Sequence, residues 1–241
     1  MKERMLRRYL LYACAVAWAV LSGCQQPATN RSADKVAQTH TPNATAETSS
    51  NSAANHAANS AANFDYYLFT LSWSPEYCHG HPNSPQCDGE HPGFVVHGLW
   101  PQFDNGHWPS ACSSAPGLSN PNRMLDIMPD RRLIRHEWST HGTCSGLTAN
   151  QYFGAIRQAY ASIKIPLQWV HPARTSTKSS NEIKRDFMDA NPGMSDADIA
   201  ISCHNRYLTA VAFCLSKNLQ PVACQAVTDC NARSIRIPAA Q

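Results

Sequence analysis

The stretch Phe64-Asp-Tyr-Tyr-Leu-Phe-Thr-Leu-Ser-Trp73 decides the class of fold. Its aromatic and β-branched residues are typical of a strand buried in a sheet, so we expect a strand over residues 64–73. A second run of the same character, Phe94-Val-Val-His-Gly-Leu-Trp100, predicts another strand over residues 94–100. These two runs put a β-sheet at the centre of the fold.

The segments that follow alternate between helical and extended patterns. Leu133, Ile134 and Trp138 recur at helical spacing, which predicts a helix over residues 131–141 that Gly142 ends. The capping box Thr148-Ala-Asn-Gln151 opens a second helix that continues to Ser162. Strands at both ends with helices between them, without regular βαβ alternation, indicate a single α+β domain. Three more elements are expected: a short helix over 182–189, a strand over 206–215 and a final edge strand over 234–237.

The first 63 residues differ in character from the rest. Residues 1–24 have the pattern of an export signal, with a basic stretch followed by an apolar run too short to span a membrane. The signal ends in Leu21-Ser22-Gly23-Cys24, which resembles a bacterial lipobox and predicts lipidation of Cys24. The alternative is a soluble exported protein whose signal merely contains a cysteine. Residues 25–63 are rich in Ala, Asn, Ser and Thr, so we expect a disordered tether before the folded residues 64–241.

Composition and charge exclude some classes of protein. The chain has 241 residues, 43% of them hydrophobic, and a formal net charge of +3. The export signal accounts for all of this positive charge, because the residues that follow it include 16 basic and 16 acidic side chains. Because the residues after the export signal carry no net charge, we exclude a protein that binds nucleic acid through a broad basic surface. A local site for an anion remains possible in such a chain. No uninterrupted apolar stretch reaches the ~18 residues of a membrane-spanning helix, which excludes an integral membrane protein.

Eight cysteines follow Cys24, at positions 78, 87, 112, 144, 203, 214, 224 and 230. An even number of cysteines in an exported chain predicts four disulfides. A structural zinc site needs closely spaced pairs of the C-x₂₋₄-C kind, which these spacings do not provide. The residues alone leave the pairing open.

Two histidine-containing segments could perform chemistry. One is His97-Gly-Leu-Trp-Pro101, and the other is His136-Glu-Trp-Ser-Thr-His-Gly-Thr-Cys144. The second differs from the zinc-protease motif H-E-x-x-H by one extra residue. On a helix, positions five apart lie roughly 140° apart around the axis, against roughly 40° for positions four apart. We therefore expect no metal site here, but Glu137 and His141 on one helical face with His136 beside them.

Paired histidines without a metal suit general acid–base catalysis. A histidine titrates near pH 6.5, so one imidazole can accept a proton while another donates one. RNA supplies an internal nucleophile, the 2′-hydroxyl, beside each scissile phosphate. The other histidines after the tether are not grouped with further candidate catalytic residues, so we expect them to be structural or solvated. They are His79, His81, His91, His107, His171 and His204.

These two segments resemble the two active-site segments of the ribonuclease T2 family, and the similarity covers residues 64–237. The resemblance implies an α+β fold around a central antiparallel sheet with flanking helices, and an endoribonuclease that uses no metal or other cofactor. It implies His141 as the base for the 2′-hydroxyl, His97 as the acid for the 5′-oxygen, and a 2′,3′-cyclic phosphate product. Glu137 would stabilise the phosphoryl centre and His136 would bind phosphate. Trp100 would stack a base.

The resemblance also implies a disulfide pattern, namely Cys78–Cys87, Cys112–Cys144, Cys203–Cys230 and Cys214–Cys224. Two positions depart from the family pattern. Thr140 stands where the family usually has a lysine, directly before the second catalytic histidine, and Gln102 stands where some members have an aspartate that selects the base. The base preference of the family is therefore not transferred.

The leading hypothesis is a periplasmic endoribonuclease that acts on RNA. We expect a monomer without an obligate protein partner, tethered through Cys24 to the outer membrane, because Gln25 does not resemble the aspartate that retains lipoproteins at the inner membrane. A metallohydrolase is one alternative. The other is an RNA-binding or inhibitory protein with weakened catalysis, which Thr140 suggests.

Overall fold

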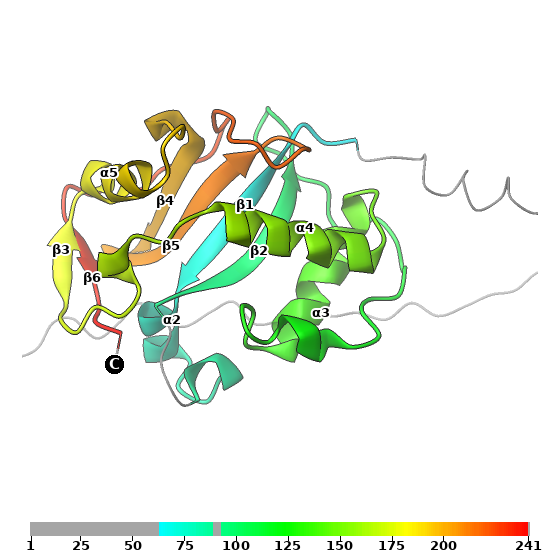
Figure 1. Cartoon of the computed structure of the whole chain (residues 1–241), viewed down its shortest axis with the longest axis horizontal. Coiled ribbons are helices and arrows are strands. Elements are labelled where there is room, and N and C mark those ends of the chain that lie inside the picture. The colour runs from blue at the N-terminus through cyan, green and yellow to red at the C-terminus, as the bar shows by residue number, and fades with distance from the viewer. Residues whose placement is uncertain (1–62, 89–92, 241) are drawn as a thin grey trace, which may run out of the picture. The chain divides into compact units, whose positions relative to one another are not determined.

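The computed structural model describes residues 63–88 and 93–240. The expectations for the export signal, Cys24, the tether and His91 lie outside these residues. The α+β fold is confirmed, with a six-stranded sheet and helices around it (Figure 1). Within the described residues, no helix combines the length and apolar character needed to cross a membrane.

The sheet is built around its first strand. β1 (Tyr66–Trp73) pairs antiparallel with β2 (Phe94–Gln102) on one side and with β5 (Tyr207–Leu215) on the other. β4 (Ile199–His204) also pairs antiparallel with β5. The two strands that the sequence patterns identified first are therefore neighbours in the sheet.

The short strands complete the far end of the sheet. β6 (Ile235–Ile237) meets β5 through one parallel pair and pairs antiparallel with β3 (Ser176–Lys178). The prediction that residues 234–237 form an edge strand is wrong, because β3 covers the outer side of β6. Apart from that single parallel pair, the pairing of the sheet is antiparallel, as expected.

Capping side chains fix where the helices begin. Asp130 accepts a hydrogen bond from the backbone of α3 (Arg131–Thr140), and the predicted capping box opens α4 (Ala149–Ser162). A second capping box, Ser179 with Glu182, starts α5 (Ser180–Ala190) two residues earlier than expected. One helix was not predicted, α2 (Ser74–Gly80), which follows β1 directly and has a proline in its first turn.

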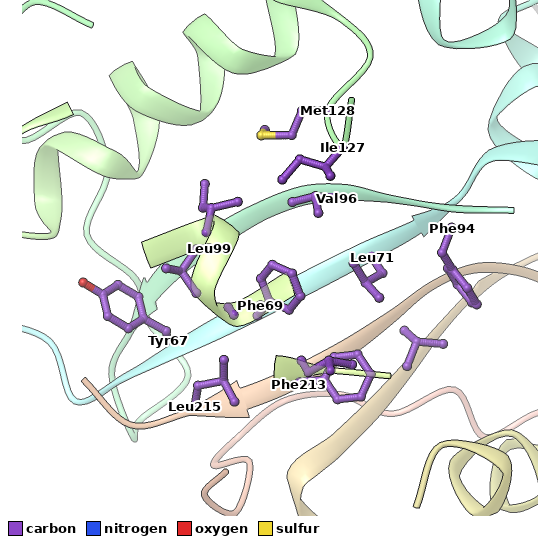
Figure 2. Packing of buried hydrophobic residues seen from close by; sticks show 14 of the residues in the cluster. Tyr67, Phe69, Leu71, Phe94, Val96, Leu99, Ile127, Met128, Phe213 and Leu215 are labelled. Atoms are coloured by element: carbon purple, nitrogen blue, oxygen red, sulfur yellow. The ribbon is translucent and has the colours of Figure 1, made fainter. Parts of the chain in front are cut away.

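The main core lies between the sheet and these helices. Phe69 and Leu71 of β1 are fully buried, and Figure 2 shows them beside Val96 and Leu99 of β2. Helices α3 and α4 contact β2, and α5 contacts β4. Alternate residues of β1, such as Leu68, face a smaller cluster on the other side of the sheet. Because β1 is buried on both faces, most of its residues are apolar, and Thr70 and Ser72 are the polar exceptions.

Four disulfides join the described cysteines, in the pairs that the family resemblance implied. Cys112–Cys144 ties the segment after β2 to the turn that follows α3, and Cys78–Cys87 closes the loop after α2. Two more bridges hold the C-terminal segment against β4 and β5. Each bridge restricts the unfolded chain and contributes about 2–4 kcal/mol.

Candidate active site

A β-bulge in β2 presents His97. Thr70 pairs with Gly98 and Leu71 pairs with Val96, so His97 is the extra residue on its strand. A bulge leaves such a residue outside the regular ladder and changes the direction of its side chain. The hydroxyl of Ser72 lies 2.9 Å from His97 Nδ1 and fixes the ring, which leaves Nε2 free to face the rest of the site.

Glu137 is fully buried at the centre of the site. Its Oε2 accepts a hydrogen bond of 2.6 Å from the indole nitrogen of Trp100, and its Oε1 lies 3.6 Å from His97 Nε2. Gly98 makes this approach possible, because a β-carbon at that position would overlap the Glu137 carboxylate and crowd the Trp100 indole. Oε1 has no hydrogen-bond partner among the described residues.

His141 completes the arrangement from the end of α3. It is the residue after the last helical one, and its backbone nitrogen still donates to the carbonyl of Glu137. The Trp100 ring contacts both histidines, with its centroid 5.1 Å from the ring of His97 and 5.3 Å from that of His141. The neighbouring disulfide Cys112–Cys144 anchors the turn that contains His141. Its Nδ1 is buried and unpaired among the described residues.

His136 lies at the exposed rim of the site. Its ring centroid is 6.3 Å from that of His141, and the Thr140 hydroxyl lies 3.3 Å from its Nδ1. Arg132, one helical turn earlier, pairs with Asp130 at 3.6 Å, and 71% of its side chain is exposed. The structure thus brings all five predicted site residues together, from β2 and from the last turn of α3.

The expectation that His136 and His141 lie too far apart to share a ligand is wrong. Side-chain ligand atoms of His136, Glu137 and His141 all lie within 4.8 Å of one another. The angle of roughly 140° applies within a regular helix, whereas His141 is the C-cap of α3, where φ is −115°. The residue types would permit a metal, so removal of metal ions by a chelator tests the prediction of metal-free chemistry.

Burial controls the charge of the site. Desolvation, with a smaller contribution from the nearby His136, lowers the pKa of His97 to about 4. Desolvation, with contributions from His136 and His97, also lowers the pKa of His141 to about 4. Desolvation raises the pKa of Glu137 to about 8 against the opposing hydrogen bond from Trp100. Near neutral pH the imidazoles of His97 and His141 are therefore neutral in the free site, and the carboxyl group of Glu137 is protonated.

We expect Glu137→Gln to change stability in a pH-dependent way. Above its ordinary pKa of 4.5, the folded protein keeps a proton on Glu137 that the unfolded chain releases, so stability falls as the pH rises toward 8. Glutamine does not titrate. The variant should therefore gain at least about 2 kcal/mol relative to wild type between pH 5 and pH 8, since one pKa unit corresponds to about 1.4 kcal/mol.

Urea unfolding at both pH values measures this difference. The exposed Glu182, changed to glutamine, retains its capping geometry and serves as the control. A stability difference between Glu137→Gln and wild type that stays constant from pH 5 to pH 8 would contradict the raised pKa.

Ser72 is the site residue that sequence reasoning missed. What could not be foreseen is the bulge that brings His97 within hydrogen-bond distance of its hydroxyl. A serine in a strand has no distinguishing pattern of its own.

Comparison with known proteins supports a single family. A model of the Ribonuclease T2 family matches residues 64–224. A ribonuclease of Aeromonas hydrophila is 45% identical over 93 residues, which are 37% of this chain and 41% of that protein. A probable ribonuclease of Haemophilus influenzae is 30% identical over 179 residues, which are 67% of this chain and 61% of that protein. The matches thus span less than two thirds of either relative.

Solved structures agree at the level of the fold. An RNase-related protein from Calystegia sepium superposes with a TM-score of 0.63 at 23% identity, covering 74% of this chain and 98% of that one. The family model covers both histidine segments and all the strands of the sheet except β6. This chain belongs to the ribonuclease T2 family.

Proposed function

We propose that this protein is an endoribonuclease that cleaves single-stranded RNA by attack of the 2′-hydroxyl on the adjacent phosphate. The observation that supports this most is the grouping of His97, Glu137 and His141 around the ring of Trp100. Two imidazoles that contact the same aromatic ring are close enough for one to act on the attacking 2′-oxygen and the other on the leaving 5′-oxygen of one phosphodiester. The neutral imidazole needed as a base is available without any change of protonation.

In the proposed reaction, His141 takes the proton of the 2′-hydroxyl while that oxygen bonds to phosphorus. The bond from phosphorus to the 5′-oxygen breaks, and His97 gives its proton to that oxygen. The products are a 2′,3′-cyclic phosphate and a free 5′-hydroxyl. His136, at the rim, would bind the phosphate, and Trp100 would stack a base.

Glu137 would supply the proton that His97 needs. The carboxyl group is protonated near neutral pH, and its Oε1 lies 3.6 Å from His97 Nε2. An incoming phosphate is an anion and favours the imidazolium form of the neighbouring histidine. Substrate binding would therefore move the proton from Glu137 to His97, where the leaving oxygen can receive it.

A chelator experiment separates this proposal from a metallohydrolase. We expect the purified protein to cleave RNA at an unchanged rate in excess chelator, with cyclic phosphate at the new 3′-ends. Activity that disappears with the chelator and returns with zinc would favour the metallohydrolase. RNA binding without cleavage would favour the weakened binding protein.

Thr140 offers a test of charge at the site. Removing one donor that faces a developing negative charge typically lowers the rate by about 10²–10³-fold. Thr140 stands where the family usually has a lysine, and its hydroxyl carries no charge. We expect Thr140→Lys to raise kcat on a dinucleotide several-fold. Arg132→Ala should lower kcat if that guanidinium, one turn before His136, supplies part of the missing charge. If both variants equal wild type, charge does not limit the rate here.

The four disulfides favour an oxidising compartment, so we propose an exported, periplasmic enzyme. Cys24→Ser should release the protein from the membrane fraction, because the lipid would be its only anchor. The specific activity should not change, because about 40 residues of tether would separate the lipid from the active site. Fractionation with an assay of each fraction tests this, and mass spectrometry of an unlipidated wild-type protein would support the soluble alternative. We also propose a monomer without an obligate protein partner.

A further inference from the structure

The exposed face of α3 is strongly basic. Its exposed side chains include Arg131, Arg132, Arg135 and His136, and none of the exposed residues of this helix is acidic. At roughly 100° per residue, these four positions lie within an arc of roughly 140° around the helix axis. The acidic residue of the helix, Glu137, is fully buried in the active site. Because the chain after the export signal has no net charge, this concentration of cations is a local feature of one helix.

Two of these arginines have donors that are free for a ligand. The side chain of Arg135 makes no hydrogen bond or ion pair with the residues that the structure describes. Arg131 donates from Nε to Asn122 Oδ1 at 2.6 Å, and its two terminal nitrogens have no partner in the described part of the chain. Arg132 differs, because it pairs with Asp130 at 3.6 Å. A guanidinium group presents a planar fork of N–H donors that matches the oxygens of a phosphate, so Arg131 and Arg135 suit phosphate binding.

A groove connects Arg135 with the active site. It has a volume of about 400 Å³ and lies between α3 and residues 115–121, with Arg135 and His136 among its lining residues. The indole nitrogen of Trp138 donates a hydrogen bond of 2.7 Å to the carbonyl of Ala115, which holds this segment against the helix. His136 would bind the scissile phosphate in the proposed reaction. RNA that continues from the active site on this side would therefore enter the groove and pass Arg135.

The proposed roles of the two catalytic histidines decide which part of the RNA lies here. His97 of β2 would act on the leaving 5′-oxygen, so the nucleotides that follow the cleaved bond extend from its side of the site. His141, at the end of α3, would act on the 2′-hydroxyl of the nucleotide that precedes the bond. The nucleotides before the cleaved bond therefore extend toward α3.

An anionic membrane surface is the other kind of partner that a basic helix face could bind. Helices that lie on membranes insert an apolar face into the lipid. The exposed residues of α3 are all polar; they are Arg131, Arg132, Arg135, His136 and Ser139. This composition and the groove beside His136 favour RNA.

We infer that the basic face of α3 binds phosphates of the RNA strand on the 5′ side of the cleaved bond, with Arg131 and Arg135 as its contacts. The inference rests on the proposed function, in which His141 activates the 2′-hydroxyl. A dinucleotide has no phosphate beyond the scissile one, so this face contributes only to the binding of longer substrates. The protein would then cleave a bond that has several nucleotides before it faster than a bond next to the 5′ end.

Two oligonucleotides of equal length that differ only in the position of the cleavable bond test the inference. Each consists of 2′-O-methyl RNA with a single ordinary ribonucleotide, which is the last but one nucleotide in the first substrate and the first nucleotide in the second. On the first substrate, we expect Arg131→Gln and Arg135→Gln each to lower kcat/KM about fivefold at 0.1 M salt. This size follows because each phosphate contact to a single strand adds about 0.7 to the slope of log K against log salt.

The second substrate and a dinucleotide should be cleaved by both variants at the wild-type kcat/KM. Arg185→Gln is the matched control, because Arg185 is an exposed arginine of α5. That helix contacts β4, which β5 and β1 separate from β2. The control should equal wild type on all three substrates.

An equal loss on both oligonucleotides, or no loss on the first, would overturn the inference even if every substrate is cleaved. If no substrate is cleaved, the proposed function fails, and binding of the fully 2′-O-methylated oligonucleotide still tests the basic face. We expect Arg131→Gln and Arg135→Gln to weaken that binding and Arg185→Gln to leave it unchanged; wild-type affinity in both α3 variants would overturn the inference. Weaker binding of these variants to phosphatidylglycerol vesicles, with unchanged cleavage of the first oligonucleotide, would assign the face to a membrane surface and also overturn it.

Discussion

Replacing either His97 or His141 by alanine should lower kcat on a dinucleotide by about 10²–10⁴-fold, the usual contribution of a general acid or base. The double variant should be little worse than either single one, because the two groups transfer protons in one concerted step. The fold should persist, since both side chains are partly exposed at the edge of the core.

Steady-state kinetics with circular dichroism measures both effects. His171→Ala changes an exposed histidine that is not part of the site, and it should keep full activity. If either His97→Ala or His141→Ala retained more than about a tenth of wild-type turnover, that histidine would not be a proton-transfer group.

Gly98→Ala should have the next largest effect. A β-carbon at this position would overlap the Glu137 carboxylate and crowd the Trp100 indole, so the two side chains that organise the site must separate. We expect stability to fall by about 1–3 kcal/mol, as is typical of overpacking. We expect kcat to fall by about 10²-fold, because a small displacement of catalytic groups has an effect of that size.

The chain offers a matched glycine for comparison. A β-carbon at Gly154, which is exposed in α4, would meet no atom within 4 Å. Gly154→Ala should therefore stabilise the protein by about 0.5–1 kcal/mol through helix propensity, with unchanged kcat. Wild-type activity in Gly98→Ala would show that the close approach of Glu137 to β2 is not needed.

The elements that sequence reasoning identified are those with strong local signals. β1 and β2 have long apolar runs, and the capping box of Thr148 and Gln151 forms as expected at the start of α4. β4 was missed because its turn into β5 has no glycine. Asn205 and Arg206 both adopt positive φ there, a conformation for which arginine gives no sequence signal.

The residue identities of the site were predictable, but their arrangement was not. Both histidine segments contain recognisable groups of residues, whereas the contact between Glu137 and Trp100 joins elements 37 positions apart. That contact depends on the bulge at His97 and on the absence of a side chain at Gly98. The position of His141 depends on where α3 ends, which is one residue earlier than the pattern predicted. Tertiary packing determines each of these features.

The role of the 2′-hydroxyl is the most direct test of the account. Phosphorus NMR can follow the wild-type protein, in excess chelator, with a ribodinucleotide and with its analogue that lacks only the 2′-hydroxyl at the scissile position. We expect the ribodinucleotide to be converted to a 2′,3′-cyclic phosphate and the deoxy analogue to stay intact. Cleavage of the deoxy analogue, or a product that never passes through the cyclic phosphate, would contradict the account.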